Sequence, residues 1–169
     1  MPDSILVTFS TIYGSTQQVA ERIAVTLREK GVAVDLQPVK QVRSIDTYSA
    51  VVLGAPLYMF HWHKDALGFL SRHRAALAQK PIAIFALGPI NNVEKEFQEA
   101  RAMLDKELAK FPWLAPAAIE IVGGRLEPAK FRFPHNLIPV MKNMPASDIR
   151  DWAAIRDWAS DLSTKLQTA

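Results

Sequence analysis

Cysteine is absent from this 169-residue sequence. Without thiols the protein forms no disulfide bond, performs no thiolate chemistry and binds no metal through cysteine. Long hydrophobic runs are missing as well, because no apolar stretch approaches the roughly 20 residues that span a bilayer. The first residues, Met1-Pro2-Asp3-Ser4, carry no basic segment, so we expect no signal peptide and a cytoplasmic location.

The sequence also lacks the signatures of several proteins with alternating strands and helices. It has no Gly-x-Gly-x-x-Gly run, which a nicotinamide-binding Rossmann domain requires. A response-regulator receiver needs an aspartate at the end of its third strand, where this chain has Gly54-Ala55. A small tyrosine phosphatase needs a nucleophilic cysteine, which this chain does not have.

The composition is that of a globular protein. Hydrophobic residues make up 49% of the chain and charged residues 22%, and the net charge is +3. A chain of this length can bury a substantial core, and we expect residues 1–169 to form one domain. A mildly basic surface favours acidic partners or an anionic membrane face, and we expect no nucleic-acid partner.

Hydrophobic periodicity predicts five strands separated by helices. The expected strands are 4–9, 32–36, 50–55, 81–87 and 117–122, and the expected helices are 15–30, 64–79, 94–110 and 148–166. Strands that alternate with helices form parallel β-α-β units, so the predicted class is α/β with helices on both faces of the sheet. The stretch 125–147 is too long for an ordinary connection and is treated as an irregular insert.

A hydroxyl-rich turn joins the first strand to the first helix, with the sequence Ser10-Thr11-Ile12-Tyr13-Gly14-Ser15-Thr16. Such a turn offers backbone N–H groups, hydroxyl donors and the positive end of a helix dipole, which together bind anions. It has no lysine, so it is not a P-loop, and its neutral donors suit a single terminal phosphomonoester. The alternative is an ordinary turn in which Ser15 or Thr16 caps the helix.

This turn resembles the FMN phosphate loop of flavodoxins, which has the pattern Thr/Ser-x-Tyr/Thr-Gly-Ser/Asn-Thr. Gly124-Arg125-Leu126 is similar to a Gly-x-Leu pattern after the fifth strand of quinone-linked relatives. Through these matches the sequence resembles flavodoxin-domain proteins of the menaquinone-dependent protoporphyrinogen dehydrogenase type. The resemblance implies a flavodoxin-like, doubly wound five-stranded parallel sheet in the order 2-1-3-4-5. It also implies noncovalent FMN with its phosphate at residues 10–16.

In that family two further loops flank the flavin ring. The resemblance assigns this role to Pro56-Leu57-Tyr58-Met59-Phe60 after the third strand, and to Leu87-Gly88-Pro89 and Asn91 after the fourth. Other interpretations stay open, because Phe60 and Trp62 are equally suited to cover the core, and Asn91 and Asn92 to cap the next helix. The loop between Pro56 and Lys64 contains no glycine, and Phe60 stands where the porphyrinogen-type relatives carry one. We therefore expect a stiff loop and two-electron chemistry.

His61 and His63 are separated by one residue and have no carboxylate or cysteine beside them that would favour a metal site. We expect no metal and interpret both as loop or surface residues.

The insert contains cations, aromatic and aliphatic residues between Lys130 and Met144. In the quinone-linked relatives a segment at this place is tied to membrane or quinone access. Two interpretations stay open: Phe131, Phe133, Leu137 and Met141 pack on the domain itself, or residues 130–144 touch an anionic membrane as a weak peripheral contact.

The resemblance implies an FMN-dependent oxidoreductase that passes electrons from a protoporphyrinogen-like donor to a quinone-like acceptor. The alternative is an electron carrier that has a redox partner but no substrate of its own. We expect no catalytic side chain, because the redox chemistry belongs to the cofactor.

Overall fold

A parallel sheet lies at the centre of the computed structural model, which describes residues 4–130, 137, 139–143 and 145–168. Its main strands are β1 (Ser4–Phe9), β2 (Ala33–Pro38), β3 (Tyr48–Tyr58), β5 (Ile82–Leu87) and β6 (Ala118–Val122). They pair in the order β2-β1-β3-β5-β6, and every one of these pairings is parallel. Counted along the chain as five main strands, this confirms the expected order 2-1-3-4-5.

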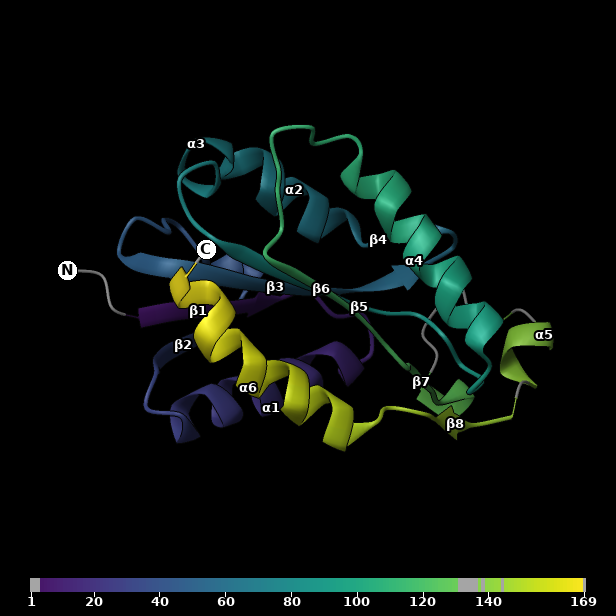
Figure 1. Ribbon diagram of the computed structural model, residues 1–169. Helices are drawn as coiled ribbons and strands as arrows, with labels where there is room; N and C mark the ends of the chain where they lie inside the picture. The colour runs from purple at the N-terminus through teal and green to yellow at the C-terminus, as the bar shows by residue number, and fades with distance from the viewer. Residues whose placement is uncertain (1–3, 131–136, 138, 144, 169) are drawn as a thin grey trace.

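Helices cover both faces of the sheet, as the sequence predicts (Figure 1). One face carries α1 (Ser15–Glu29) and α6 (Trp152–Thr168). The other carries α2 (Lys64–Arg72), α3 (Arg74–Leu77) and α4 (Glu94–Leu108). Because the strands are parallel, their carboxyl ends meet at one edge of the sheet, where ligands bind in folds of this class.

The central strands are continuously apolar because both of their faces are covered. In β3, Ala50 and Val52 pack toward α1 and α6, whereas Val51 and Leu53 pack toward the opposite layer. In α1 the buried apolar residues recur at helical spacing, which fixes the face turned to the sheet. They are Val19, Ala20, Ile23, Ala24 and Leu27.

One glycine in β3 is required by its neighbour. A Cβ at Gly54 would lie 1.9 Å from the ring of Phe85 on β5. The same ring meets Trp158 of α6 edge-on, with 6.2 Å between centroids. The missing side chain thus makes room for an aromatic contact that joins the sheet to α6.

Three differences from the predicted boundaries are the largest. The helix expected over 64–79 is interrupted at His73, which has φ −105° and ψ 21° and is buried with its ring 4.6 Å from that of Phe69. The last helix begins at Trp152 and not at 148, because Asp148 belongs to a strand. β3 continues to Tyr58 because it pairs with a short strand, β4 (His61–Trp62).

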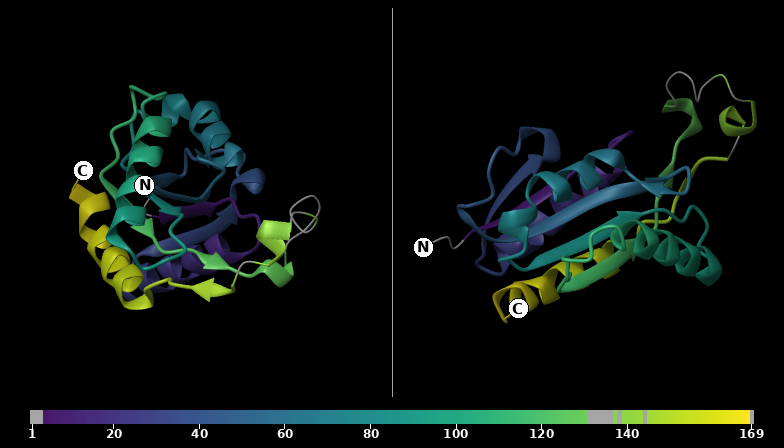
Figure 2. Two further views of the ribbon diagram at one scale, coloured as in Figure 1. Left: turned by 90° about the vertical axis from the view of Figure 1, so that its right-hand side faces the viewer. Right: turned by 90° about the horizontal axis from the view of Figure 1, so that it is seen from above.

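Small elements follow β6 and precede α6. β7 (Arg125–Leu126) pairs antiparallel with β8 (Ser147–Asp148), so the two ends of the stretch 125–147, predicted to be irregular, are joined by a ribbon. Figure 2 shows η2 (Pro128–Lys130) and α5 (Pro139–Lys142) beyond the end of the sheet. A further short helix, η1 (Val39–Gln41), follows β2.

The interpretation that the insert packs on the domain is wrong for Leu137, which is 67% exposed, and the neighbouring Val140 is 76% exposed. Phe131 and Phe133 lie outside the described residues, as does the side chain of Met141. In the described part of the chain, no helix combines the length and the apolar character needed to cross a membrane.

Replacing Gly54 by alanine should destabilise the fold by about 1–3 kcal/mol, because the new methyl overlaps Phe85 and forces the core to shift. Gly68, exposed on α2 with nothing within 4 Å of the position where a Cβ would be, is the matched control. Gly68→Ala should stabilise the helix by roughly 0.5–1 kcal/mol. Urea unfolding of the two variants measures both effects, and equal stabilities would contradict the overlap.

Candidate functional site

The turn after β1 brings α1 to the edge of the sheet with its first N–H groups turned outward. Gly14 has φ 92°, a left-handed conformation that glycine adopts without strain, and it is the residue from which α1 starts. Its own N–H donates to Thr11 Oγ1 at 2.8 Å. No side chain of the described residues caps this helix, so Ser15 and Thr16 do not act as the capping residues of an ordinary turn.

Two hydroxyl groups in this turn lack partners. Ser10 is 5% exposed and Thr16 is fully buried, yet Ser10 Oγ and Thr16 Oγ1 have no hydrogen-bond partner among the described residues. A buried polar group without a partner costs about 1–3 kcal/mol. The cost, together with the uncapped N-terminus of α1, indicates that the turn is built to surround an anion.

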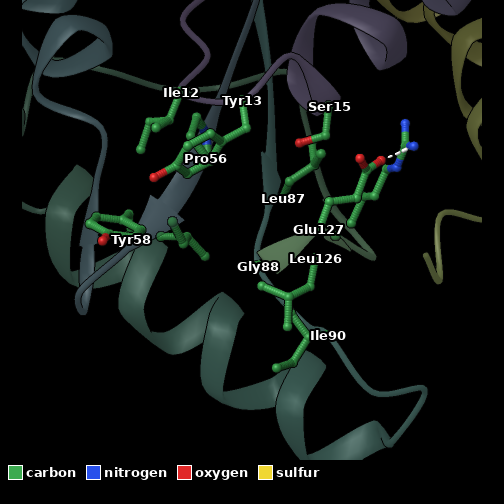
Figure 3. Close-up of a pocket in the computed structure, with 13 residues that line it drawn as sticks. Ile12, Tyr13, Ser15, Pro56, Tyr58, Leu87, Gly88, Ile90, Leu126 and Glu127 are labelled. Carbon is green, nitrogen blue, oxygen red and sulfur yellow. Dashed lines mark ion pairs between the residues drawn. The ribbon is translucent and has the colours of Figure 1, made fainter. Parts of the chain in front are cut away.

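A cavity of about 220 Å³ opens beside this turn at the carboxyl ends of β1, β3 and β5. Figure 3 shows Ile12, Tyr13, Pro56 and Tyr58 along one side and Ser15 and Glu127 on the other. The residues that line it are Ile12, Tyr13, Ser15, Pro56, Leu57, Tyr58, Leu87, Gly88, Ile90, Gly124, Arg125, Leu126 and Glu127. The lining is mainly apolar, which suits a flat ring system of low polarity.

The sequence prediction and the cavity overlap in part. Eight of the predicted site residues line it: Ile12, Tyr13, Ser15, Pro56, Leu57, Tyr58, Leu87 and Gly88. The remaining predicted residues lie in the same loops without lining it: Ser10, Thr11, Gly14, Thr16, Met59, Phe60, Pro89 and Asn91. Sequence reasoning missed Ile90, Gly124, Arg125, Leu126 and Glu127. The Gly-x-Leu resemblance at 124–126 was the available signal for three of these.

A tight hairpin carries the aromatic side of the cavity. Tyr58 pairs with His61, which leaves Met59 and Phe60 as a two-residue turn. These two have φ 51° and 67°, and positive φ at both central residues is the mark of a type I′ turn. Neither is glycine, so the turn carries backbone strain of about 1–3 kcal/mol at each residue. The side chain of Phe60 is 77% exposed and does not cover the core.

Trp62 anchors this hairpin. It is 1% exposed, and its indole N–H donates to the Ala55 carbonyl at 3.0 Å. The alternative interpretation, that the aromatic residues of this loop belong to the core, therefore applies to Trp62. Nearby, burial and the neighbouring Tyr13 raise the pKa of Tyr58, so its phenol remains a neutral hydrogen-bond donor at physiological pH.

The loop after β5 is held by Glu96 in the first turn of α4. The Glu96 carboxylate accepts the N–H groups of Ile90 and Asn91, at 3.1 and 3.0 Å, and the Asn91 side-chain amide at 2.7 Å. Hydrogen bonds from Asn91 lower the pKa of Glu96. In this structure Asn91 thus has the turn role that the sequence left open.

The two histidines of the hairpin make separate contacts. His61 Nδ1 lies 3.2 Å from Glu107 Oε1 of α4, and Lys110 donates to the same oxygen at 3.0 Å. His63 Nδ1 accepts the N–H of Asp65 at 3.3 Å and so caps α2. The pair of His61 and Glu107 connects α4 to the hairpin that carries Tyr58.

Comparison with known proteins agrees with the fold. The flavodoxin domain family matches residues 6–148. The chain belongs to this family. Protoporphyrinogen IX dehydrogenase [quinone] of Escherichia coli strain K12 is 25% identical over 159 residues, covering 90% of this chain and 87% of the relative. The protein of the same name from Leishmania major is 25% identical and covers 94% of this chain and 74% of the relative.

Solved structures agree on the fold. An archaeal flavodoxin superposes with a TM-score of 0.61 at 13% identity, covering 97% of this chain and 99% of the other. Rubredoxin oxygen:oxidoreductase from Desulfovibrio gigas gives 0.62 at 16% identity, and the match covers 98% of this chain but 36% of that protein. The family and the fold confirm the expected flavodoxin-like architecture and indicate a flavin redox protein.

Glu107 should make the stability of the hairpin region pH-dependent. Burial raises the pKa of Glu107, but hydrogen bonds from Lys110 and His61 outweigh it and leave that pKa below its ordinary value. A lowered carboxylate pKa stabilises the fold above the unfolded-state value, near 4.3, and this stability is lost as the pH falls through the folded-state pKa. Glu107→Gln should therefore cost about 1–2 kcal/mol at pH 7, and the difference from the wild type should shrink in acid.

The matched control is Glu99→Gln on the same helix, where Glu99 pairs with Lys95 at 3.8 Å in solvent. This change should alter the free energy of unfolding by less than about 1 kcal/mol, as for other exposed pairs. Urea unfolding between pH 3 and 8 follows both variants. A similar pH profile for the two would show that the buried pair contributes nothing of its own.

Proposed function

We propose that this chain is an FMN-dependent oxidoreductase that transfers electrons from a protoporphyrinogen-like donor to a quinone. One observation carries the proposal: buried, unpartnered hydroxyl groups at the start of α1 adjoin a mainly apolar cavity at the strand ends. FMN has two matching parts, an anionic phosphate at one end that suits the polar turn and a flat ring at the other that suits the apolar cavity.

The turn after β1 fits the phosphate. Ser10 and Thr16 offer hydroxyl groups that have no partner within the described part of the chain, and Thr11 and Ser15 add two more hydroxyls in the same turn. Gly14 has no side chain to block approach to the helix N-terminus, and nothing lies within 4 Å of the position where its Cβ would be. In the proposal these groups hold the phosphate by neutral hydrogen bonds.

The loops after β3 and β5 fit the ring. Pro56, Leu57 and Tyr58 flank it in the proposal, with Met59 and Phe60 at the turn of the hairpin. Leu87 at the end of β5, the strand paired with β3, and the adjacent Gly88 also line the cavity. Pro89 and Asn91 belong to the same loop. Glu96 holds the backbone of this loop, because its carboxylate accepts the N–H groups of Ile90 and Asn91, and a rearrangement would break these hydrogen bonds. The apolar surfaces of Pro56, Leu57 and Leu87 would exclude water from the reacting ring.

The protein's own part in the reaction is binding and orientation. FMN, when bound, supplies the two-electron redox chemistry that side chains cannot provide. Among the described residues that line the cavity, Arg125 and Glu127 are the ionised ones and they pair with each other. The Tyr58 phenol is neutral, so it adds a hydrogen-bond donor to the apolar contacts that the cavity offers.

The proposed electron donor and acceptor are inferred from the names of the relatives. Proteins named protoporphyrinogen IX dehydrogenase [quinone] align with most of this chain at 25% identity. For each two electrons withdrawn, the donor loses two protons and one quinone becomes a quinol, so the balance needs no further oxidant. A cytoplasmic location and a weak membrane contact through 130–144 remain predictions, since much of that segment lies outside the described residues.

Thr16→Ala should weaken FMN binding by about 10- to 100-fold, because a hydrogen bond to a charged group contributes about 1.5–3 kcal/mol. Riboflavin, which has no phosphate, should bind the variant and the wild type alike. Thr26→Ala on the same helix is the control, since Thr26 donates to the Arg22 carbonyl and lies away from the turn. Quenching of flavin fluorescence reports both affinities, and equal FMN affinity in the Thr16 and Thr26 variants would refute the phosphate assignment.

The FMN-loaded protein should convert a porphyrinogen to a fluorescent porphyrin under anaerobic conditions, but only when a quinone is added. Omitting the quinone should stop the reaction once each flavin has taken up one electron pair, before any porphyrin is complete, because the reduced flavin then has no acceptor. A pure electron carrier would show no porphyrin formation while still exchanging electrons with a redox partner. That result would replace the enzyme proposal by the carrier alternative.

A further inference from the structure

The turn after β1 has no positive side chain of its own, but the fold brings an arginine to it from β7. Arg125 lines the same cavity as Ser15, and its Nη1 donates to Gln18 Oε1 of α1 at 3.5 Å. Glu127 forms an ion pair with Arg125, and both line the cavity together with Ser15; Figure 3 labels Glu127 and Ser15 on the same side of it. A cation separated from this turn by more than 100 positions in the sequence therefore stands at the start of α1.

The backbone fixes the position of β7. The N–H of Gly124 donates to the Pro89 carbonyl at 2.6 Å, and the Gly124 carbonyl accepts the N–H of Ile149 at 3.1 Å. A Cβ at Gly123 would lie 2.4 Å from the Ile149 carbonyl oxygen, so this close approach requires glycine. Arg125 follows directly and pairs with Asp148 in the ribbon of β7 and β8. Its Cα is thus placed by hydrogen bonds to two other loops.

A second arginine nearby is already fully engaged. Arg150 is buried and donates twice to Asp148, at 2.9 and 2.8 Å, once to Gln18 Oε1 at 2.6 Å and once to the Ser15 carbonyl at 3.4 Å. These bonds hold the first turn of α1 against β8. Arg125 differs, because its side chain is 31% exposed and its closest ionic partner, Glu127, also lines the cavity.

We infer that Arg125 is a cationic ligand of the FMN phosphate, and that Glu127 is an internal anion with which the phosphate competes for it. The inference rests on FMN being the cofactor of the proposed function. A phosphate at the start of α1 would repel the Glu127 carboxylate and attract the Arg125 guanidinium, whose planar fork matches phosphate geometry. Arg125 therefore exchanges one anionic partner for another when the phosphate enters.

The test compares FMN with riboflavin, which differ in the phosphate alone. Arg125→Gln should weaken FMN binding by about 10- to 100-fold while leaving riboflavin affinity unchanged. Arg125→Lys should restore part of the loss, since it keeps the charge without the fork. Glu127→Gln should have the opposite sign and tighten FMN by a few-fold, again without effect on riboflavin. Fluorescence quenching of each flavin by the apoprotein gives all of these affinities.

Two controls separate this role from a general one. Arg101→Gln removes an equal charge from the surface of α4, where Arg101 pairs with Asp105, and should change neither affinity. Inorganic phosphate should raise the melting temperature of the wild type more than that of Arg125→Gln.

The outcomes distinguish this inference from the proposed function. Equal losses of FMN and riboflavin in Arg125→Gln, or undiminished preference for FMN, would overturn the inference while leaving the oxidoreductase proposal intact. A selective FMN loss in a protein that turns over no porphyrinogen would support the inference and refute that proposal. A wild type that binds neither flavin would overturn both, and an Arg125→Gln effect on the KM for porphyrinogen alone would reassign Arg125 to the substrate.

Discussion

The start of α1 is the constraint on which the rest of the site depends. A helix leaves its first N–H groups without partners inside the helix, and here Gly14 brings the chain into α1 with no capping side chain among the described residues. These groups, and the buried hydroxyls of Ser10 and Thr16 that have no hydrogen-bond partner among the described residues, carry a desolvation cost that a bound anion would offset. The remaining elements keep this end of α1 in place: β1 delivers it, the apolar stripe holds it to the sheet, and Arg150 ties its first turn to β8.

The sequence predicts this part well because its signals are local. An apolar run, a hydroxyl-rich turn and a 3.6-residue period are adjacent in the chain, and together they specify strand, turn and helix. The parallel order of the sheet follows from the alternation of elements and from the resemblance to flavodoxins, which the family match confirms. The resemblance to flavodoxins, and not a local signal, indicated the residues at the ends of β3 and β5 that line the cavity, such as Tyr58 and Gly88.

What the sequence did not predict depends on contacts between distant residues. The hairpin of β3 and β4 has no glycine in its turn, so its type I′ geometry at Met59 and Phe60 runs against local preference. It forms because Trp62 is buried beneath it and His61 reaches Glu107 on α4, neither of which is visible in the sequence. Likewise Arg125 and Glu127 lie in a stretch without periodicity, and the pairing of β7 with β8 across 20 intervening residues brings them to the cavity. The break at His73 has the same origin, since the ring is buried against Phe69.

The charges around the start of α1 add one argument about how the insert relates to the cavity. Arg125 and Arg150 contribute two positive charges, and Glu127 and Asp148 contribute two negative ones, so this cluster is neutral as a whole. Hydrogen bonding to Arg150 lowers the pKa of Asp148, which keeps that carboxylate ionised and committed to Arg150 at neutral pH. The pair that can change partners is then Arg125 with Glu127. Glu127 lies between β7 and η2. A movement of its side chain away from an incoming phosphate would take place where the chain leaves β7. The cavity and the insert therefore share Arg125, Leu126 and Glu127, and the ribbon of β7 and β8 is the part of the insert that adjoins the start of α1.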